Sequence, residues 1–257
     1  MFSRGNISEK ARILDEGTFE GLDGVTGMLG QDLGDVAVVD MYVGIGYFAF
    51  SYLKRGVGRV FGWEINGWSV EGLRRGCKGN GWQIRVLRVD DGGLVNDEEG
   101  MFGDEALEGL VKELRTDHKL RMVAFQGDNR WAARVMEKIK VLSDKAVELG
   151  ERSSWLEIRH INLGLLPTSR LSWEDAVGML GETTGGWVHV HENVDIRQMD
   201  QKRDFVVQQF QAHLDGDRTA SCSRIERVKT YAPGVMHCVF DMHIAPTLIA
   251  PGATEKG

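Results

Sequence analysis

The pattern of apolar and polar positions predicts short buried strands that alternate with helices. Continuous apolar runs, such as residues 36–39, are typical of strands buried on both faces of a parallel sheet. Segments with apolar residues at helical spacing follow most of these runs. We predict strands at residues 35–42, 59–63, 121–126, 158–166 and 187–194, and helices at 48–55, 68–80, 131–149, 172–180 and 196–214.

The end of the chain departs from this alternation. Two apolar runs, at residues 224–231 and 235–243, are joined by Pro233-Gly234, a pair typical of a hairpin turn. We therefore predict an α/β fold with a mainly parallel sheet and a C-terminal antiparallel hairpin. Residues 1–35 are polar and rich in glycine, and part of this segment is predicted to be loop.

Residues 81–119 form a long connection where a short one would suffice. Residues 83–89 can supply one more strand. Residues 90–118 hold 10 acidic and 2 basic side chains and are predicted to be a surface insertion. This insertion accounts for the net charge of −7, because the remainder of the chain has 29 basic and 28 acidic residues. The acidity therefore does not argue against a nucleic acid as partner of the main body.

Composition excludes several classes of protein. With 42% apolar residues the chain can bury a core, so disorder is not expected to dominate. Cys77, Cys222 and Cys238 are too few and too far apart for a disulfide scaffold, and they favour a reducing compartment such as the cytoplasm. No stretch approaches the roughly 18 uncharged apolar residues of a membrane span, and residues 1–12 are too charged for a signal peptide.

Glycines and polar residues mark the ends of three predicted strands. The first strand ends at Asp40 and runs into Gly44-Ile45-Gly46, where glycine lets the backbone turn tightly and approach a ligand. Glu64 ends the second strand about 20 residues later, the position of a carboxylate that binds ribose hydroxyls. Asp128 and Asn129 follow the third and can hydrogen-bond an adenine. Together these strand ends predict a crevice for a cofactor that contains a nucleoside.

The residues around the glycines indicate which cofactor this is. The third position of a dinucleotide-binding G-x-G-x-x-G motif is Ala49, which that motif permits, and the Gly-Lys-Ser/Thr of a phosphate-binding loop is absent. The leading Asp40 and the pair Tyr47-Phe48 favour a nucleoside without pyrophosphate. The predicted cofactor is therefore S-adenosylmethionine.

Six motifs follow one another in an order that resembles a known family. They are FSRGNISEK (2–10), DMYVGIGYF (40–48), GWEIN (62–66), GDNR (127–130), INLGLLPTS (161–169) and HVHEN (189–193). Together they resemble the family of tRNA wybutosine-synthesising protein 2, which is related to the tRNA guanosine-37 N1-methyltransferases. Those methyltransferases have a plain Asn-Leu-Pro at the fourth strand. The longer motif here, which begins at Asn162 and ends at Pro167, favours the first family.

The resemblance implies both a fold and an activity. The fold is a Rossmann-like class I S-adenosylmethionine-dependent methyltransferase fold. The enzyme transfers the 3-amino-3-carboxypropyl group of S-adenosylmethionine to C7 of 4-demethylwyosine, at position 37 of phenylalanine tRNA, and releases 5′-methylthioadenosine. Asn162 is the candidate catalytic residue, since it can orient the amino-acid chain or the base, and no general base is identifiable. The implied cofactor contacts are Ser3, Lys10, Glu64, Asp128 and Asn129.

The same resemblance suggests how the chain is organised. We expect residues 1–35 to contact the cofactor, residues 36–246 to form the catalytic domain with the insertion at 90–118, and residues 247–257 to be a tail. Family members carry an N-terminal region that helps to hold the tRNA, whereas this chain begins at the cofactor motif. The expected partners are therefore the anticodon loop of phenylalanine tRNA and an N-terminal tRNA-binding region outside this sequence.

Two other interpretations of the function stay open. In addition, a metal site at the two histidines of the last motif is not expected. The chain can instead be a methyltransferase acting at guanosine 37, or a non-catalytic subunit that binds tRNA and cofactor. His189 and His191 lie two residues apart, so they share a strand face. Because no third ligand stands at zinc spacing, packing or contact with the base is the favoured role for them.

Overall fold

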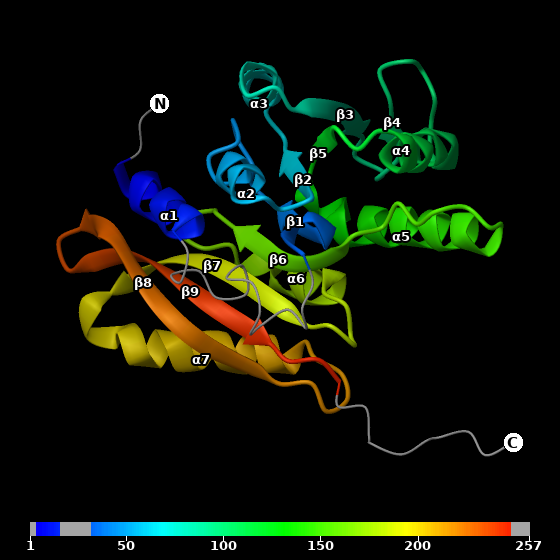
Figure 1. Cartoon of the computed structure of the whole chain (residues 1–257). Coiled ribbons are helices and arrows are strands. Elements are labelled where there is room, and N and C mark those ends of the chain that lie inside the picture. Colours follow the sequence, from blue (N-terminus) through cyan, green and yellow to red (C-terminus); the bar gives the residue numbers. More distant parts are fainter. Residues whose placement is uncertain (1–3, 16–31, 248–257) are drawn as a thin grey trace, which may run out of the picture.

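The computed structural model describes residues 4–15 and 32–247, and in this part of the chain the strands form one nine-stranded sheet (Figure 1). Its strand order is β4-β3-β5-β2-β1-β6-β7-β9-β8. Six strands from β3 to β7 are parallel, whereas β4, β9 and β8 pair antiparallel. The predicted mainly parallel sheet and terminal hairpin are thus confirmed. The strands are β1 (Val36–Asp40), β2 (Arg59–Glu64), β3 (Gln83–Val89), β4 (Val95–Asn96), β5 (Leu120–Gln126), β6 (Glu157–Leu163), β7 (Gly186–Asp195), β8 (Ala220–Ala232) and β9 (Val235–Ile244).

Helices cover both faces of the sheet, and β1 shows why. Val36 and Val38 pack into the cluster that holds α1, α2 and α3, whereas Ala37 and Val39 pack into the cluster that holds α4 to α7. Because successive side chains of a strand point to opposite faces, a strand buried on both faces needs an uninterrupted apolar run. The helices are α1 (Arg4–Leu14), α2 (Ala49–Arg55), α3 (Gly67–Gly79), α4 (Asp104–Thr116), α5 (Ala132–Glu148), α6 (Trp173–Met179) and α7 (Met199–Ala212).

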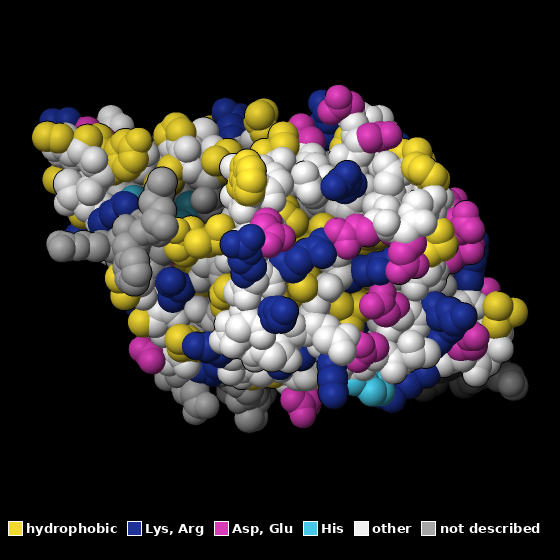
Figure 2. Space-filling view, turned by 90° about the horizontal axis from the view of Figure 1, so that it is seen from above, with side chains coloured by type: hydrophobic (Ala, Val, Ile, Leu, Met, Phe, Trp, Pro, Cys, Tyr) yellow, Lys and Arg dark blue, Asp and Glu magenta, His cyan; other side chains and the backbone are white. Residues whose placement is uncertain are grey.

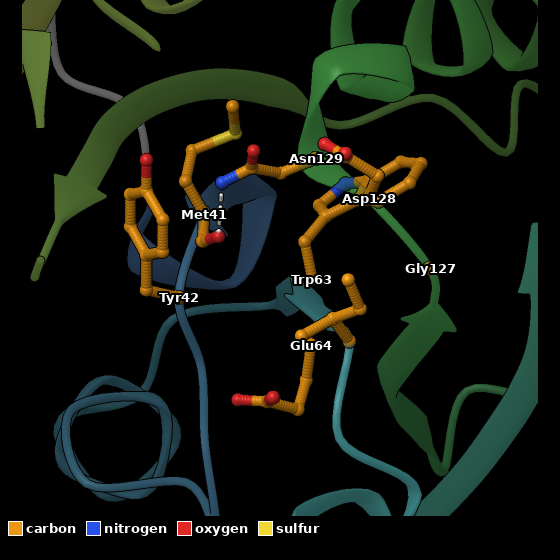
Figure 3. A pocket seen from close by; sticks show the side chains of 8 residues that line it. Met41, Tyr42, Trp63, Glu64, Gly127, Asp128 and Asn129 are labelled. Carbon is orange, nitrogen blue, oxygen red and sulfur yellow. Dashed lines mark hydrogen bonds between the residues drawn. The ribbon is translucent and has the colours of Figure 1, made fainter. Parts of the chain in front are cut away.

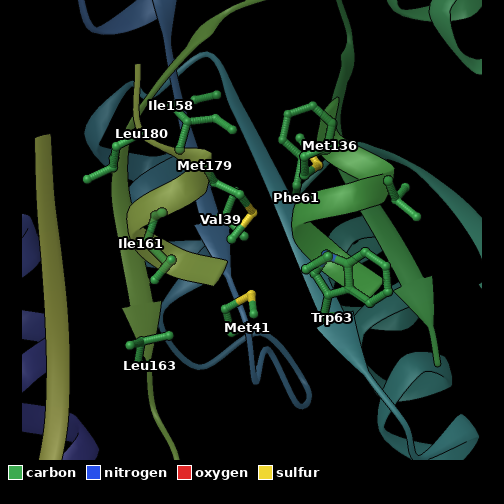
Figure 4. Close-up of a cluster of buried hydrophobic side chains, with 14 of the residues drawn as sticks. Val39, Met41, Phe61, Trp63, Met136, Ile158, Ile161, Leu163, Met179 and Leu180 are labelled. Atoms are coloured by element: carbon green, nitrogen blue, oxygen red, sulfur yellow. The ribbon is translucent and has the colours of Figure 1, made fainter. Parts of the chain in front are cut away.

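Figure 4 shows the core that lies between the strands β1, β2 and β6 and the helices α5 and α6. Met136 of α5 and Met179 at the end of α6 pack against the side chains of Val39, Phe61 and neighbouring strand residues. These side chains are almost completely buried. The core therefore fixes the relative positions of β1, β2 and β6, the strands whose ends carry the predicted site. None of the helices in the described residues is long and apolar enough to cross a membrane.

The acidic segment 90–118 is not the surface insertion that its charge predicts. It contributes β4 to the sheet edge and α4, whose inner side chains are buried in the main core. The physical reason is that α4 is amphipathic, with its acidic residues on the outer face and its apolar residues at helical spacing on the inner face. The buried residues of α4 are Ala106, Leu107, Leu110, Val111 and Leu114.

The structure adds local detail to the predicted elements and shortens one of them. Within residues 1–35, which were predicted to be loop only in part, residues 4–14 form α1. The strand predicted at 158–166 ends at Leu163. Ser172, which stands before α6, makes no side-chain capping bond, and its hydroxyl is hydrogen-bonded to the Tyr42 hydroxyl at 2.7 Å. That bond joins the end of β1 to the segment after β6, which only the tertiary structure brings together.

Candidate functional site

The ends of β1, β2 and β5 meet around one open cavity of about 200 Å³ (Figure 3). These strands are neighbours in the sheet and run parallel, so their carboxyl ends lie at the same edge. Three residues predicted to bind the cofactor, Glu64, Asp128 and Asn129, line this cavity together. The other lining residues are Met41, Tyr42, Trp63, Ile65 and Gly127.

Each polar residue of this cavity is held by a local hydrogen bond. Glu64 Oε1 accepts the backbone N–H of Asn66 at 2.7 Å, which orients the carboxylate at the end of β2. Asp128 Oδ1 accepts the N–H of Arg130 at 3.0 Å. The Asn129 side-chain amide donates to the carbonyl of Met41 at 2.8 Å and so ties the end of β5 to the end of β1, as the dashed line in Figure 3 shows.

The glycine turn after β1 adopts backbone conformations that side chains disfavour. Gly44 has φ +55°, and a Cβ atom there would stand 3.9 Å from Glu64 Oε2. Gly46 has φ +95°, and a Cβ atom there would lie 2.6 Å from Cζ of Phe50. Gly44 therefore keeps the approach to the Glu64 carboxylate clear, while Gly46 lets α2 pack closely against the turn.

Asp40 lies at the end of β1 beneath this turn and is completely buried. Its Oδ1 accepts the backbone N–H of Tyr42 at 3.2 Å, but Oδ2 has no hydrogen-bond partner among the described residues. Burial raises the pKa of Asp40 to about 7, and the nearby charge of Glu64 adds to the rise. A buried carboxylate oxygen without a partner is an acceptor available to a ligand.

Asn162 lies directly beside Asp40, because the two residues are paired in the register of β6 and β1. The structure places Asn162 in the interior rather than in the lining of the first cavity. Its Oδ1 accepts the Tyr52 hydroxyl at 3.1 Å, whereas Nδ2 has no partner in the described part of the chain. An unpaired acceptor on Asp40 and an unpaired donor on Asn162 thus stand on adjacent strands.

Lys10 belongs to a second cavity of about 500 Å³, between α1 and the glycine turn. Gly46 and Tyr47 line this cavity, and the Lys10 ammonium stands 5.3 Å from the centre of the Tyr47 ring. The structure therefore separates Lys10 from the cavity of Glu64, with the turn between them. Ser3 lies outside the described residues.

A buried ionic layer, which no sequence signal indicated, fastens α1 to the hairpin. Arg12 donates to Glu9 on its own helix and forms two hydrogen bonds with Asp241 of β9, at 2.5 and 3.0 Å. Asp241 also contacts His189 Nδ1 at 2.7 Å, and His189 Nε2 lies 2.9 Å from His160 Nδ1. We call these five residues the ionic layer.

The ionic layer and its neighbours account for both histidines of the HVHEN motif. His189 is part of the layer, and His191 Nδ1 lies 3.0 Å from His237 Nε2. Burial, together with the neighbouring His237, lowers the pKa of His191 well below its usual value, so this ring is neutral. Among the described residues, no group of three or more His, Cys, Asp or Glu side chains is arranged to hold a metal ion.

Sequence reasoning missed the apolar lining of the first cavity. Ile65 is 72% exposed beside Glu64, and Trp63 stacks on Phe125 with ring centres 4.7 Å apart. In the sequence, only their position next to Glu64 indicated that these two residues could line the cavity. On the face of Figure 2, basic and acidic side chains are interspersed among hydrophobic ones, so no single charge dominates that view.

Comparison with known proteins finds relatives that are similar to this chain over most of its length. No protein-family model matches it. The chain is 35% identical over 242 residues to tRNA wybutosine-synthesizing protein 2 of Schizosaccharomyces pombe, and 32% identical over 264 residues to that of Saccharomyces cerevisiae. These matches cover 94% and 95% of this chain but 46% and 44% of the two relatives. The chain thus spans about half the length of the curated relatives it matches.

Solved structures agree at the level of the fold. M. jannaschii TYW2 in complex with AdoMet has a TM-score of 0.56 at 17% identity, and the match covers 96% of this chain and 78% of that one. Trm5b from Pyrococcus abyssi has a TM-score of 0.54 at 15% identity and covers 95% and 50%. The chain shares the fold of these solved proteins and, by sequence, is similar to tRNA wybutosine-synthesizing protein 2 of the two yeasts over about half of their length.

Proposed function

We propose that this chain transfers the 3-amino-3-carboxypropyl group of S-adenosylmethionine to C7 of 4-demethylwyosine, at position 37 of phenylalanine tRNA. One observation carries the proposal. In a chain whose relatives are named for wybutosine synthesis, β1, β2 and β5 bring Glu64, Asp128 and Asn129 to one cavity beside a glycine turn. The fold likeness to a TYW2 solved with AdoMet supports the same donor.

The lining of the first cavity fits the adenosine part of this donor. Glu64 uses Oε1 for a backbone bond, and Oε2 faces the glycine turn, where it can accept hydrogen bonds from ribose hydroxyls. Ile65 and Met41 offer apolar contact to a base, and the outer oxygen of Asp128 can accept from an exocyclic amine. These residues would hold the nucleoside without any pyrophosphate group.

Asp40 and Asn162 fit the amino-acid end of the donor. That end carries an ammonium, which donates hydrogen bonds, and a carboxylate, which accepts them. Asp40 Oδ2 and Asn162 Nδ2 are the complementary unpaired groups, and they are buried side by side at the ends of β1 and β6. We propose that this pair, with Lys10 and Ser3 from the N-terminal segment, orients the amino-acid chain.

The donor, when bound, supplies a sulfonium with three electrophilic carbons. Positioning decides which carbon the nucleophile reaches, because the attacking atom must lie in line at about 3–3.5 Å. Asn162 is the catalytic residue of this proposal, since its side chain orients either the amino-acid chain or the target base. The ring carbon that attacks must then lose its proton.

Incubation with S-adenosylmethionine labelled in the methionine carboxyl group, together with precursor tRNA, tests the proposal. Transfer of the aminocarboxypropyl group carries the label into the tRNA, whereas methyl transfer leaves it in solution. Glu64→Gln is the matched variant, because it removes the charge of a cavity residue and keeps its shape. Label that stays in solution would overturn the transferase assignment.

A second candidate is methyl transfer to guanosine 37, favoured by the fold likeness to Trm5b. It predicts S-adenosylhomocysteine as product instead of 5′-methylthioadenosine. A third, a non-catalytic tRNA-binding or cofactor-binding subunit, predicts cofactor binding without turnover, and Glu64→Gln would then leave tRNA modification intact. Product analysis of one reaction separates all three.

The organisation of the chain is also part of the proposal. Residues 1–35 would contribute cofactor contacts, residues 36–246 the catalytic domain and residues 247–257 a tail. Because the curated relatives are about twice as long, a further region would help to hold the anticodon loop of the tRNA. The free thiols of Cys77, Cys222 and Cys238 support a cytoplasmic location.

A further inference from the structure

A basic cavity lies at the edge of the sheet opposite the cofactor crevice. Its volume is about 350 Å³, and its walls are the segments that lead into β1, β2, β5 and β6. Four arginines from these segments and from the end of α4 face it, accompanied by one histidine and one carboxylate. These side chains are Arg59, Arg115, Arg121, Arg152, His118 and Asp35.

The positive charge of this cavity is not balanced by carboxylates. Arg115 forms an ion pair with Glu151. In residues 32–247, the part of the chain around this cavity that the structure describes, no ion pair is formed by the other three arginines. Three guanidinium groups thus converge on one cavity with a single acidic side chain, Asp35, in its wall.

Arg59 is the most buried of these cations, at 6% exposed. Its two terminal nitrogens donate to the carbonyls of Ser154 and Leu114, at 2.7 and 3.3 Å, whereas Nε has no partner in the described chain. Burial lowers the pKa of Arg59 to about 10, and no neighbouring carboxylate opposes that effect. Burying a charge without an opposite charge is costly, so a bound anion would be stabilising here.

Helix ends explain part of this arrangement. Arg59 donates to Leu114 in the last turn of α4, and Arg121 donates to Leu53 and Val57 at the end of α2. Cations complement the partial negative charge of a helix C-terminus, which is about half an elementary charge. Two full guanidinium charges exceed the partial charges of two helix ends. Arg152 adds a third charge, and within the described part of the chain it forms neither an ion pair nor a side-chain hydrogen bond.

We infer that this basic cavity is a phosphate-binding site, separate from the cofactor crevice. Guanidinium groups present planar donors that match phosphate oxygens, and a phosphate group can accept from several of them at once. The cavity lies at the first residue of β2, whereas Glu64 is its last, so roughly 17 Å of strand separates the two sites. The group bound is either free phosphate or a phosphate of an RNA backbone.

Titration of the whole chain with inorganic phosphate, followed by calorimetry at constant ionic strength against chloride, tests the inference. Wild-type protein is expected to bind phosphate saturably. Arg152→Ala should weaken binding by about tenfold, the usual effect of losing one charge-assisted hydrogen bond. Arg152 is exposed, so its removal leaves the fold intact. Arg197→Ala is the matched control, because Arg197 is also exposed but pairs with Asp195 on another part of the molecule.

The absence of saturable phosphate binding to the wild type would overturn the inference, as would equal binding by Arg152→Ala. A second titration, with tRNA, distinguishes the two sources of phosphate. If the RNA backbone occupies the cavity, Arg152→Ala lowers tRNA affinity and reduces its salt dependence by about one ion. If free phosphate is the ligand, tRNA affinity is unchanged. The result of the phosphate titration does not depend on the transferase proposal. Either proposal can therefore fail without the other.

Discussion

Two buried aspartates, Asp40 and Asp241, lie on the same sheet and behave in opposite ways. Both are about 2% exposed or less. Asp40 receives one backbone hydrogen bond, its other carboxylate oxygen has no partner within residues 4–15 and 32–247, and burial raises its pKa to about 7. Asp241 is held by Arg12 and His189, and although it is also buried, their charges and hydrogen bonds keep its pKa well below the usual range.

The difference shows how partners separate a structural carboxylate from one that is available to a ligand. The ionic layer satisfies its own charges, so Asp241 serves to hold α1 against the hairpin. At the end of β1, Asp40 Oδ2 is a buried acceptor that has no partner in the described chain. Burying such an atom is energetically costly, and a bound group that donates a hydrogen bond to it would remove the cost. The proposed site therefore includes buried polar atoms that lack a hydrogen-bond partner among the described residues.

The largest expected effect comes from breaking the ionic layer. Arg12→Ala leaves the buried Glu9 and Asp241 carboxylates without their cation and should destabilise the fold by about 3–5 kcal/mol. Unfolding in urea measures this loss of the free energy of unfolding. The control is Arg75→Ala, whose exposed pair with Glu71 should be worth less than about 1 kcal/mol. Similar losses in the two variants would show that the layer does not anchor α1.

Asp40→Asn should change how stability depends on pH. Because the folded pKa of about 7 lies above the unfolded value, ionisation opposes folding. The penalty is absent below about pH 4, grows as pH rises and is complete above pH 7, where it amounts to about 4 kcal/mol. The free energy of unfolding, measured across this pH window, should decline in the wild type but not in Asp40→Asn. Parallel curves would contradict the assigned pKa.

Glu64→Gln should weaken cofactor binding without weakening the fold. Loss of the charge-assisted hydrogen bonds proposed for ribose hydroxyls is worth about 1.5–3 kcal/mol, or roughly 10-fold to 100-fold in affinity. Calorimetry with S-adenosylmethionine measures the affinity, and thermal unfolding measures the fold. Glu71→Gln on the exposed face of α3 is the control. An unchanged affinity in Glu64→Gln would remove Glu64 from the proposed site.

The smallest effect is expected at the Tyr42 hydroxyl, beside the end of β1. Tyr42→Phe removes the hydroxyl that joins β1 to Ser172 and should cost about 1 kcal/mol of stability. It keeps the ring at the cavity wall, so cofactor affinity should be nearly unchanged. A large loss of affinity with unchanged stability would place the hydroxyl in the site itself.

The sequence predicted the crevice but not the ionic layer, for a physical reason. Strand ends in a parallel sheet follow from local patterns, so the meeting of Glu64, Asp128 and Asn129 could be foreseen. The bond from Arg12 to Asp241 spans 229 residues. No local pattern encodes such a contact.

The acidic segment shows a different limit. Its net charge favoured a surface insertion, but α4 has an apolar face at helical spacing that includes Leu110 and Leu114. Deletion of residues 90–118 would therefore expose core instead of trimming a loop, and even Leu110→Ala should cost about 2–5 kcal/mol. Charge counted along a sequence says nothing about which face of a helix carries it.

We propose that this site presents the γ-carbon of the donor, not its methyl group, to the tRNA base. The most direct measurement is the nucleoside released during one turnover with precursor tRNA. The account predicts 5′-methylthioadenosine in amounts equal to the modified tRNA, and its loss in Glu64→Gln. Release of S-adenosylhomocysteine, or no product from a protein that still binds the donor, would contradict it.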